Sequence, residues 1–297
     1  MAKMSREERL ELRVEKGRVL YEAVEKGTAF DLPRIMCIGL QKGGVAKTTL
    51  VSNLGSALTA LNKKVLLVDM DPQGSLTLGL EVDLMPDFDD EMTMREVLVG
   101  DIPIANALQQ IKPNLFIAPA FISLYGAIPF LQARPSPTTA LSKALQSVKD
   151  LFDYILIDTP PGFGVLVQNA LFASSEVIIP WVQSDPYSTY AVPEYLHSIL
   201  EIQEMDKSRA HINGVINTIA VPKNNSEPST RAGRVNTELM IESYGPDIFF
   251  KTEIPRNTRL SEGIFVGNSA IDYDAKSPGA QAYLSLAKEI INQEVTP

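Results

Sequence analysis

Apolar residues occur along most of the chain in short unbroken runs, separated by longer stretches with helical periodicity. The runs that we interpret as buried strands are Ile35–Leu40, Val65–Val68, Leu115–Ala118, Tyr154–Ile157, Val177–Val182 and Ile212–Asn217. Continuous apolar runs, unlike strands that alternate apolar and polar residues, are typical of a parallel sheet covered on both faces. The pattern therefore predicts an α/β fold with a doubly wound, mainly parallel sheet and helices on both faces.

The segments outside these strands divide the chain into two parts. Residues 5–26 are expected to form an amphipathic helix, because Ser5 and Glu8 make a capping box ahead of an apolar stripe. This helix either packs on its own domain or contacts a second copy of the chain. We therefore assign residues 1–32 to an N-terminal helical extension and residues 33–297 to one domain. Within the domain, the acidic stretch 81–93 reads as a surface loop and 221–234 as a loop running into a helix.

Composition narrows the function classes. The 297 residues are 45% hydrophobic and contain one cysteine, Cys37, so an intramolecular disulfide and a site built from several cysteines are excluded within one chain. The net charge of −9 excludes a uniformly basic coat for nucleic acid. We find no signal peptide and no apolar window of about 18–20 residues, so we expect a soluble, cytoplasmic protein without membrane attachment.

The strongest chemical signal is a glycine-rich loop between the first predicted strand and a helix that runs to about Leu61. It consists of Gln41, Lys42, Gly43, Gly44, Val45, Ala46, Lys47, Thr48 and Thr49. Glycines let backbone amides converge on phosphate oxygens, and the start of the helix adds the positive end of its dipole. Lys47 is placed to neutralise phosphate charge, and the Thr48 hydroxyl is placed to bind Mg²⁺. A glycine-rich turn that binds nothing is the alternative.

Two further strands end in carboxylates. Val65–Asp71 reads VLLVDMD, which we interpret as a buried strand carrying Asp69 and Asp71 on one side, and Ile155–Gly162 reads ILIDTPPG. The carboxyl ends of parallel strands share one edge of the sheet, where ligands bind in open α/β folds. Asp158 is therefore placed to hold a Mg²⁺ water. Taken alone, an aspartate after a strand is often only a turn former or helix cap.

Together these motifs resemble the ParA/MinD family of ATPases with a deviant phosphate loop. The resemblance runs from about Pro33 to Ala287 and includes Lys251–Gly263, KTEIPRNTRLSEG. It implies two ATP molecules sandwiched between two subunits, with Lys42 reaching the partner's nucleotide. It also implies that Asp71 positions the attacking water and belongs with the Mg²⁺ site, that Thr48 binds magnesium and that Asp158 is the second acidic element. Asn217 and Pro255 match positions near the adenine.

One departure concerns Ala46, where the family usually has glycine. Alanine is tolerated there if the backbone φ is negative and strained if φ is positive. Other branches of the family fit less well, because the chain lacks cluster cysteines, a basic amphipathic C-terminal helix and a second phosphate loop. Residues 280–295 read instead as an ordinary packing helix.

The ParA branch binds nonspecific DNA, so a local basic face is expected. Residues 207–259 carry eight positive and five negative charges, a net of +3, which leaves −12 for the rest of the chain. The best candidates for phosphate contacts are Arg231, Arg234, Arg256 and Arg259. The alternative is a solvated surface with a chance excess of charge.

The resemblance implies a ParA-like ATPase for plasmid or chromosome partition. Such a protein forms an ATP-dependent homodimer on nucleoid DNA, and a ParB-like centromere-binding or cargo adaptor protein stimulates its hydrolysis. The competing interpretation is a nucleotide-gated positioner of a protein assembly, such as a microcompartment or chemotaxis cluster, without a direct DNA role.

Overall fold

The computed structural model describes residues 33–85, 88–206, 210–220, 223–224, 227–228, 230–257, 262–263 and 267–293. The expected N-terminal extension, residues 1–32, lies outside the described residues. The strands are β1 Arg34–Ile38, β2 Val65–Asp69, β3 Gln109–Lys112, β4 Leu115–Ala118, β5 Tyr154–Asp158, β6 Glu176–Trp181, β7 His211–Asn217, β8 Lys223–Asn224 and β9 Glu227–Pro228. The α-helices are α2 Lys47–Ala60, α3 Ser75–Gly79, α4 Met94–Val99, α5 Ile104–Ala107, α6 Ala127–Gln132, α7 Ala140–Leu145, α8 Val165–Ala173, α9 Pro186–Asp206, α10 Arg231–Tyr244, α12 Ala270–Tyr273 and α13 Pro278–Asn292. Short 3-10 turns are η1 Val82–Leu84, η2 Ile122–Gly126, η3 Lys149–Leu151 and η4 Pro246–Ile248.

Seven strands form the main sheet in the order β3-β4-β2-β5-β1-β6-β7. All neighbouring pairs are parallel except β3 and β4, which run antiparallel. The doubly wound, mainly parallel sheet predicted from the apolar runs is therefore confirmed. The edge strand β3, with the sequence QQIK, was missed because its polar residues give no buried-strand pattern.

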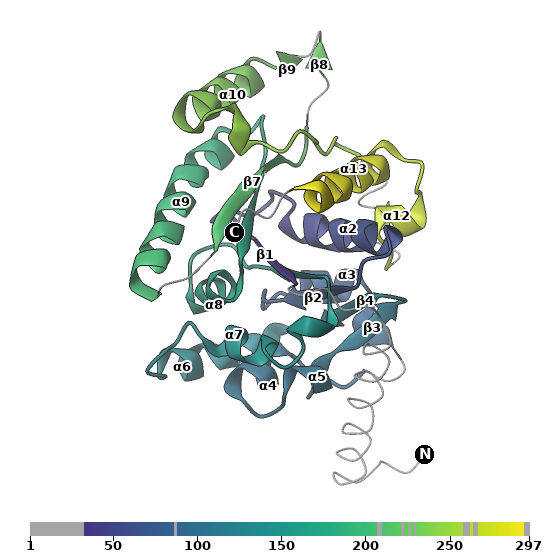
Figure 1. Cartoon of the computed structure of the whole chain (residues 1–297), viewed down its shortest axis with the longest axis vertical. Helices are drawn as coiled ribbons and strands as arrows, with labels where there is room; N and C mark the ends of the chain where they lie inside the picture. Colours follow the sequence, from purple (N-terminus) through teal and green to yellow (C-terminus); the bar gives the residue numbers. More distant parts are fainter. Residues whose placement is uncertain are drawn as a thin grey trace.

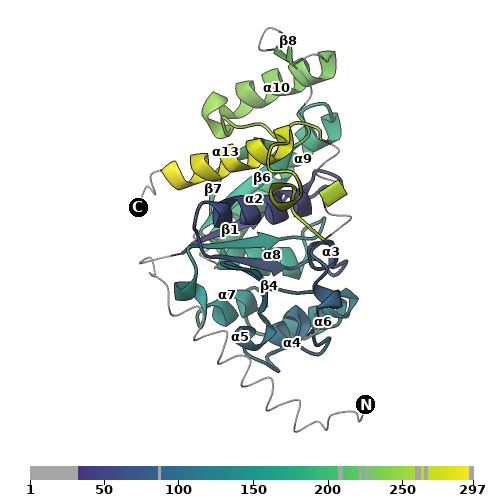
Figure 2. The ribbon, with the colours of Figure 1, turned by 90° about the vertical axis from the view of Figure 1, so that its right-hand side faces the viewer.

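Helices cover the sheet on both faces (Figures 1 and 2). Along β2, Val65 and Leu67 join one core cluster with helices α2 and α13, whereas Leu66 and Val68 join the other with α4, α7, α8 and α9. This alternation explains why the strands are apolar throughout, since each face has its own core. The predicted packing helix near the C-terminus is α13, which buries Tyr283.

The strands β1, β2, β5 and β6 run in the same direction, so the loops that follow them meet at one edge of the sheet. The phosphate loop follows β1 and leads into α2. Cys37 lies in β1 just before this loop and is completely buried. Burial raises the pKa of its thiol to about 12.

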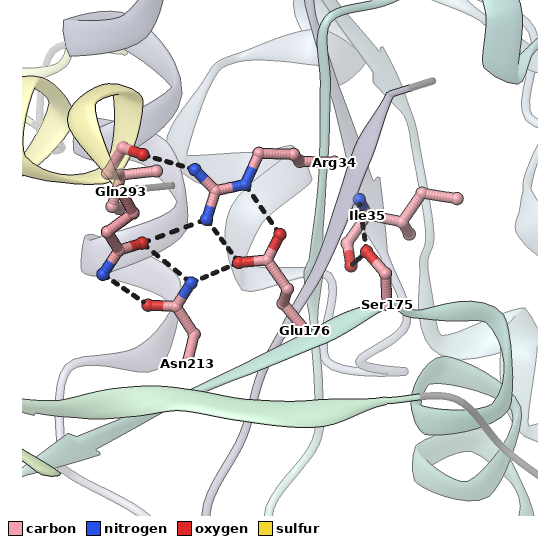
Figure 3. Close-up of polar contacts among 7 residues, drawn as sticks. Arg34, Ile35, Ser175, Glu176, Asn213 and Gln293 are labelled. Carbon is pink, nitrogen blue, oxygen red and sulfur yellow. Dashed lines mark hydrogen bonds and ion pairs between the residues drawn. The ribbon is translucent and has the colours of Figure 1, made fainter. Parts of the chain in front are cut away.

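A polar network lies at the other end of the strands, where β1 and β6 begin (Figure 3). The guanidinium of Arg34 in β1 pairs with both carboxylate oxygens of Glu176 in β6, at 2.7 and 2.5 Å. It also donates to the carbonyl oxygen of Ile290 in α13 and to the Gln293 amide oxygen. Gln293 and Asn213 exchange amide hydrogen bonds of 2.9 and 3.0 Å. The network joins three strands to the C-terminal helix.

Among the described residues, no helix has the length and apolar character needed to cross a membrane.

Candidate active site

The phosphate loop has a left-handed backbone at two positions. Gly44 has φ 76°, and Ala46 has φ 60° with ψ 33°. Of the two possibilities that the sequence left open for Ala46, the structure has the strained one. A left-handed conformation costs an alanine roughly 1–2 kcal/mol, so the loop keeps its shape against a local penalty.

The start of helix α2 offers amides to an anion. Ala46 occupies the N-cap position and no side chain caps the helix, so the first-turn amides of Lys47, Thr48 and Thr49 have no side-chain acceptor. Apart from the adjoining residues, no atom in the described part of the chain lies within 4 Å of where a Cβ would stand on Gly43 or Gly44. The loop thus presents backbone donors and a helix dipole to space that a phosphate group would fill.

Lys47 folds back into the loop. Its side chain donates to the carbonyl oxygens of Lys42 at 2.7 Å and Leu40 at 3.4 Å, and the residue is 8% exposed. Burial lowers the pKa of Lys47, while the nearby carboxylates of Asp158 and Asp71 act in the opposite direction. The ammonium is therefore held inside the loop, where the sequence predicted that it neutralises phosphate charge.

The predicted magnesium residues Thr48 and Asp158 are in direct contact. The Thr48 hydroxyl donates to Asp158 Oδ2 at 2.7 Å. Asp158 is completely buried, and its other oxygen, Oδ1, has no hydrogen-bond partner among the described residues. Burial, and then the charge of Asp69, raise the pKa of Asp158 well above its usual value. A buried carboxylate oxygen without a partner is costly, so a hydroxyl and a carboxylate in this arrangement fit a hydrated Mg²⁺ ion.

The strand before Asp71 is shorter than we predicted. Strand β2 ends at Asp69, so Asp71 lies in the following turn and strand alternation does not place the two on one side. Asp69 instead accepts hydrogen bonds from the Asp71 amide at 3.0 Å and the Thr77 hydroxyl at 2.7 Å, and burial raises its pKa to about 7. Asp71 accepts the Gln73 amide at 2.9 Å. Its charge contributes to the raised pKa of Asp158.

Lys42 is paired within its own chain. Its ammonium lies 2.8 Å from Asp185 Oδ2 and 5.3 Å from the centre of the Tyr187 ring. Asp185 was not predicted from the sequence, although it follows strand β6 at the carboxyl edge of the sheet, where Asp158 ends β5. Because the pair is about one quarter exposed, it is a moderate interaction that another anion can replace.

The end of β7 contacts the phosphate loop through a residue that the sequence analysis also missed. The Thr218 hydroxyl donates to the Val45 carbonyl oxygen at 3.0 Å. Its neighbour Asn217 is buried and donates to Glu253 at 3.2 Å, and Pro255 is bridged to Ala220 just beyond β7. The two predicted adenine-side positions therefore lie at the end of β7 and in the segment beside it.

The predicted DNA-contacting arginines are only partly described. Arg231 and Arg234 are exposed in the first turns of α10, after the Thr230 cap, and Arg256 is exposed after the bridge at Pro255. Arg259 lies outside the described residues.

The chain is similar to known proteins over most of its length. A family model described as an AAA domain matches residues 33–212. The sporulation initiation inhibitor protein Soj of Bacillus subtilis is 39% identical over 258 residues, which cover 86% of this chain and 98% of that protein. The chromosome partitioning protein ParA of Caulobacter vibrioides is 32% identical over 264 residues, covering 88% and 95%. A crystal structure of cobyrinic acid a,c-diamide synthase from Mycobacterium smegmatis, with bound ATP analogue and magnesium, has a TM-score of 0.72 at 31% identity, covering 88% and 95%.

Proposed function

The chain belongs to the ParA/MinD family of ATPases, and from that premise we propose that it is a ParA-like partition ATPase with ATP and Mg²⁺ in its phosphate loop. The observation that carries the proposal is the contact between Thr48 and Asp158, whose second carboxylate oxygen has no hydrogen-bond partner among the described residues, directly beside an uncapped helix start. ATP closes a homodimer, the dimer binds nonspecific DNA, and a ParB-like or cargo adaptor protein stimulates hydrolysis.

The hydrolysis is an in-line attack of water on the γ-phosphate. The amides at the start of α2 and the Lys47 ammonium bind phosphate oxygens and neutralise charge. Asp71 orients the attacking water from the turn after β2. Thr48 and Asp158 hold Mg²⁺, which screens the phosphate charge when bound.

Lys42 acts across the dimer in this proposal. Within one chain it is already paired with Asp185, so reaching a partner's nucleotide requires exchange of a carboxylate for a phosphate. Phosphate carries more negative charge than a carboxylate, which favours the exchange when ATP is present. A single subunit therefore has an incomplete site, and a slow reaction is expected until the dimer and the adaptor complete it.

The DNA step is supported by the relatives and by exposed arginines. Soj and ParA, which the chain resembles over most of its length, are a sporulation inhibitor and a chromosome partitioning protein by name. Arg231, Arg234 and Arg256 are exposed, as phosphate contacts require. In the cell, the proposed location is the cytoplasm, on nucleoid DNA.

Three variants test the site. Lys47→Ala should abolish ATP binding, because the phosphates lose a fixed countercharge.

Lys42→Ala should bind ATP as a single chain, but light scattering should show no dimer. Asp71→Ala should bind ATP and dimerise, but it should release no phosphate. Normal dimerisation of Lys42→Ala would show that Lys42 is only a solvated loop lysine.

The DNA role is tested separately by retention on DNA with and without ATP at two salt concentrations. The substitutions Arg231→Glu and Arg234→Glu should weaken DNA binding for all DNA sequences alike. They should also reduce the slope of log affinity against log salt concentration by about one unit per lost phosphate contact. Normal hydrolysis without any DNA retention by the wild type would favour the competing interpretation, a positioner of a protein assembly.

A further inference from the structure

The segment 182–185, which connects β6 to α9, contacts the phosphate loop directly at one end and through an intermediate residue at the other. At its far end, Asp185 pairs with Lys42 at 2.8 Å. At its near end, Trp181 offers its carbonyl oxygen to the Thr218 amide at 2.8 Å, and the same threonine donates to the Val45 carbonyl oxygen. A change at Lys42 therefore reaches this segment through one contact, and a change at Val45 reaches its start through Thr218 and Trp181.

Between these ends, Gln183 holds helix α10. Its side-chain amide donates to the Thr237 hydroxyl at 2.8 Å, and its carbonyl oxygen accepts from the Asn236 amide at 2.9 Å. Gln183 is 2% exposed and Asn236 is 5% exposed, so the bond between them is buried, whereas the bond to Thr237 is partly buried. Buried polar groups are costly without partners, so α10 moves with Gln183 more readily than it separates from it.

Helix α10 stands at the outer end of the molecule, away from the helices that pack directly on the centre of the sheet (Figures 1 and 2). Its buried positions are Gly233, Asn236 and Met240, so only one of the three is a large apolar side chain. Tyr244 at the end of the helix adds a partly buried contact with the core, so the two bonds to Gln183 hold mainly the middle of α10.

We propose that the segment 182–185 is a clasp through which the phosphate loop sets the position of helix α10. This inference rests on the proposed function, in which Lys42 leaves Asp185 for a nucleotide. Loss of that pair removes the direct tie between the segment and the phosphate loop while Asp185 stays bonded to the start of α9, so Gln183 shifts and α10 shifts with it. Because Arg231 and Arg234 lie on α10, the surface that they form changes with the state of the nucleotide site.

Amide hydrogen exchange of the full-length protein tests the clasp. In the wild type, ATPγS with Mg²⁺ should slow exchange in residues 39–49 and change the exchange rate in α10 by about threefold or more. Asp185→Asn without nucleotide should change α10 in the same direction, because it releases Lys42. Glu201→Gln, which removes an exposed carboxylate on helix α9, the helix that follows Asp185, should leave α10 unchanged.

A second variant tests the link from Gln183 to α10. Thr237→Val removes the hydroxyl that Gln183 contacts, so the response of α10 to ATPγS should fall to less than half while the affinity for ATPγS stays within about twofold. Thr252→Val is the matched control, because its hydroxyl makes a 2.7 Å bond to Glu289 away from the clasp. It should respond as the wild type does.

The outcomes separate the clasp from the function on which it rests. If ATPγS protects residues 39–49 but neither ATPγS nor Asp185→Asn changes α10, the clasp is wrong and nucleotide binding stands. A full response of α10 in Thr237→Val also overturns it. If Asp185→Asn changes α10 but ATPγS leaves residues 39–49 unprotected, the contact path stands and the proposed function is wrong.

Discussion

At the scale of single residues, Ala46 shows how the phosphate loop balances stability against shape. Its φ of 60° belongs to the region that glycine enters freely and alanine enters at a cost. The methyl group does not prevent the conformation, because the helix that begins at Lys47 and the contact of Thr218 with Val45 hold the backbone on either side. The strain is therefore stored in the loop that binds phosphate.

Replacing Ala46 by glycine should relieve this strain. We expect Ala46→Gly to raise the free energy of unfolding by about 1 kcal/mol, measured by urea denaturation. Asn62→Gly is a matched control, because Asn62 has φ 62° but asparagine tolerates this region well, so its effect should stay within about 0.5 kcal/mol. A loss of stability in Ala46→Gly would show that the methyl group contributes packing that outweighs the strain.

At the scale of elements, helix α9 packs closely against the start of the phosphate loop. Gln41 donates to the Ser198 hydroxyl at 3.1 Å. A Cβ on Gly39 would stand 2.0 Å from the Tyr195 hydroxyl oxygen and 2.8 Å from the ring carbon that bears it, so only glycine fits. The fully buried Tyr195 therefore fixes where the loop leaves β1.

Gly39→Ala should lower the free energy of unfolding by about 1–3 kcal/mol, because the methyl group overlaps Tyr195. Adding Tyr195→Phe, which removes the overlapping oxygen, should recover about half of the loss. Gly43→Ala in the same loop is the control, since its Cβ meets no atom within 4 Å and its φ is not positive. Thermal unfolding of the wild type, Gly39→Ala, the double variant and Gly43→Ala measures these stabilities. If Gly39→Ala and the double variant lose equal stability, the overlap with the Tyr195 oxygen is not the cause of the strain.

Some of these elements and contacts could be predicted from the sequence, and others could not. The parallel strands and the contact of Thr48 with Asp158 follow from apolar runs and from loops that share one sheet edge. The edge strand β3 could not be found, because its polar residues carry no core pattern. The partner of Lys42 could not be found either, since the approach of Asp185 depends on how α9 is placed in three dimensions.

At the scale of the whole molecule, the network around Arg34 joins the first strand of the sheet to β6 and to the end of the C-terminal helix. Arg34 and Glu176 are 142 positions apart, and the network adds the C-terminal helix α13 through Ile290 and Gln293. The side chain of Glu176 is 4% exposed and that of Arg34 is 14% exposed. Neither charge is well solvated, so each depends on the other.

Arg34→Ala should therefore lower the free energy of unfolding by about 3 kcal/mol, because it leaves the Glu176 carboxylate buried without its cation. Arg95→Ala provides the comparison, since Arg95 pairs with Glu96 and its side chain is 35% exposed, so its loss should cost about 1 kcal/mol or less. Chemical denaturation measures both. Equal effects would mean that the network adds no more than a surface ion pair does.

The burial of Cys37 means that the rate at which its thiol is alkylated can report on opening of the sheet. It is the one cysteine of the chain, and with a pKa of about 12 and no exposed surface its thiol is shielded from alkylating reagents while the sheet stays closed. Its labelling rate consequently counts openings of the central strand beneath the phosphate loop. A cysteine introduced on α10 or beside Lys42 would be the sole thiol that reacts quickly, so fluorescent labels or cross-linkers can follow either surface with the native sulfur left in place.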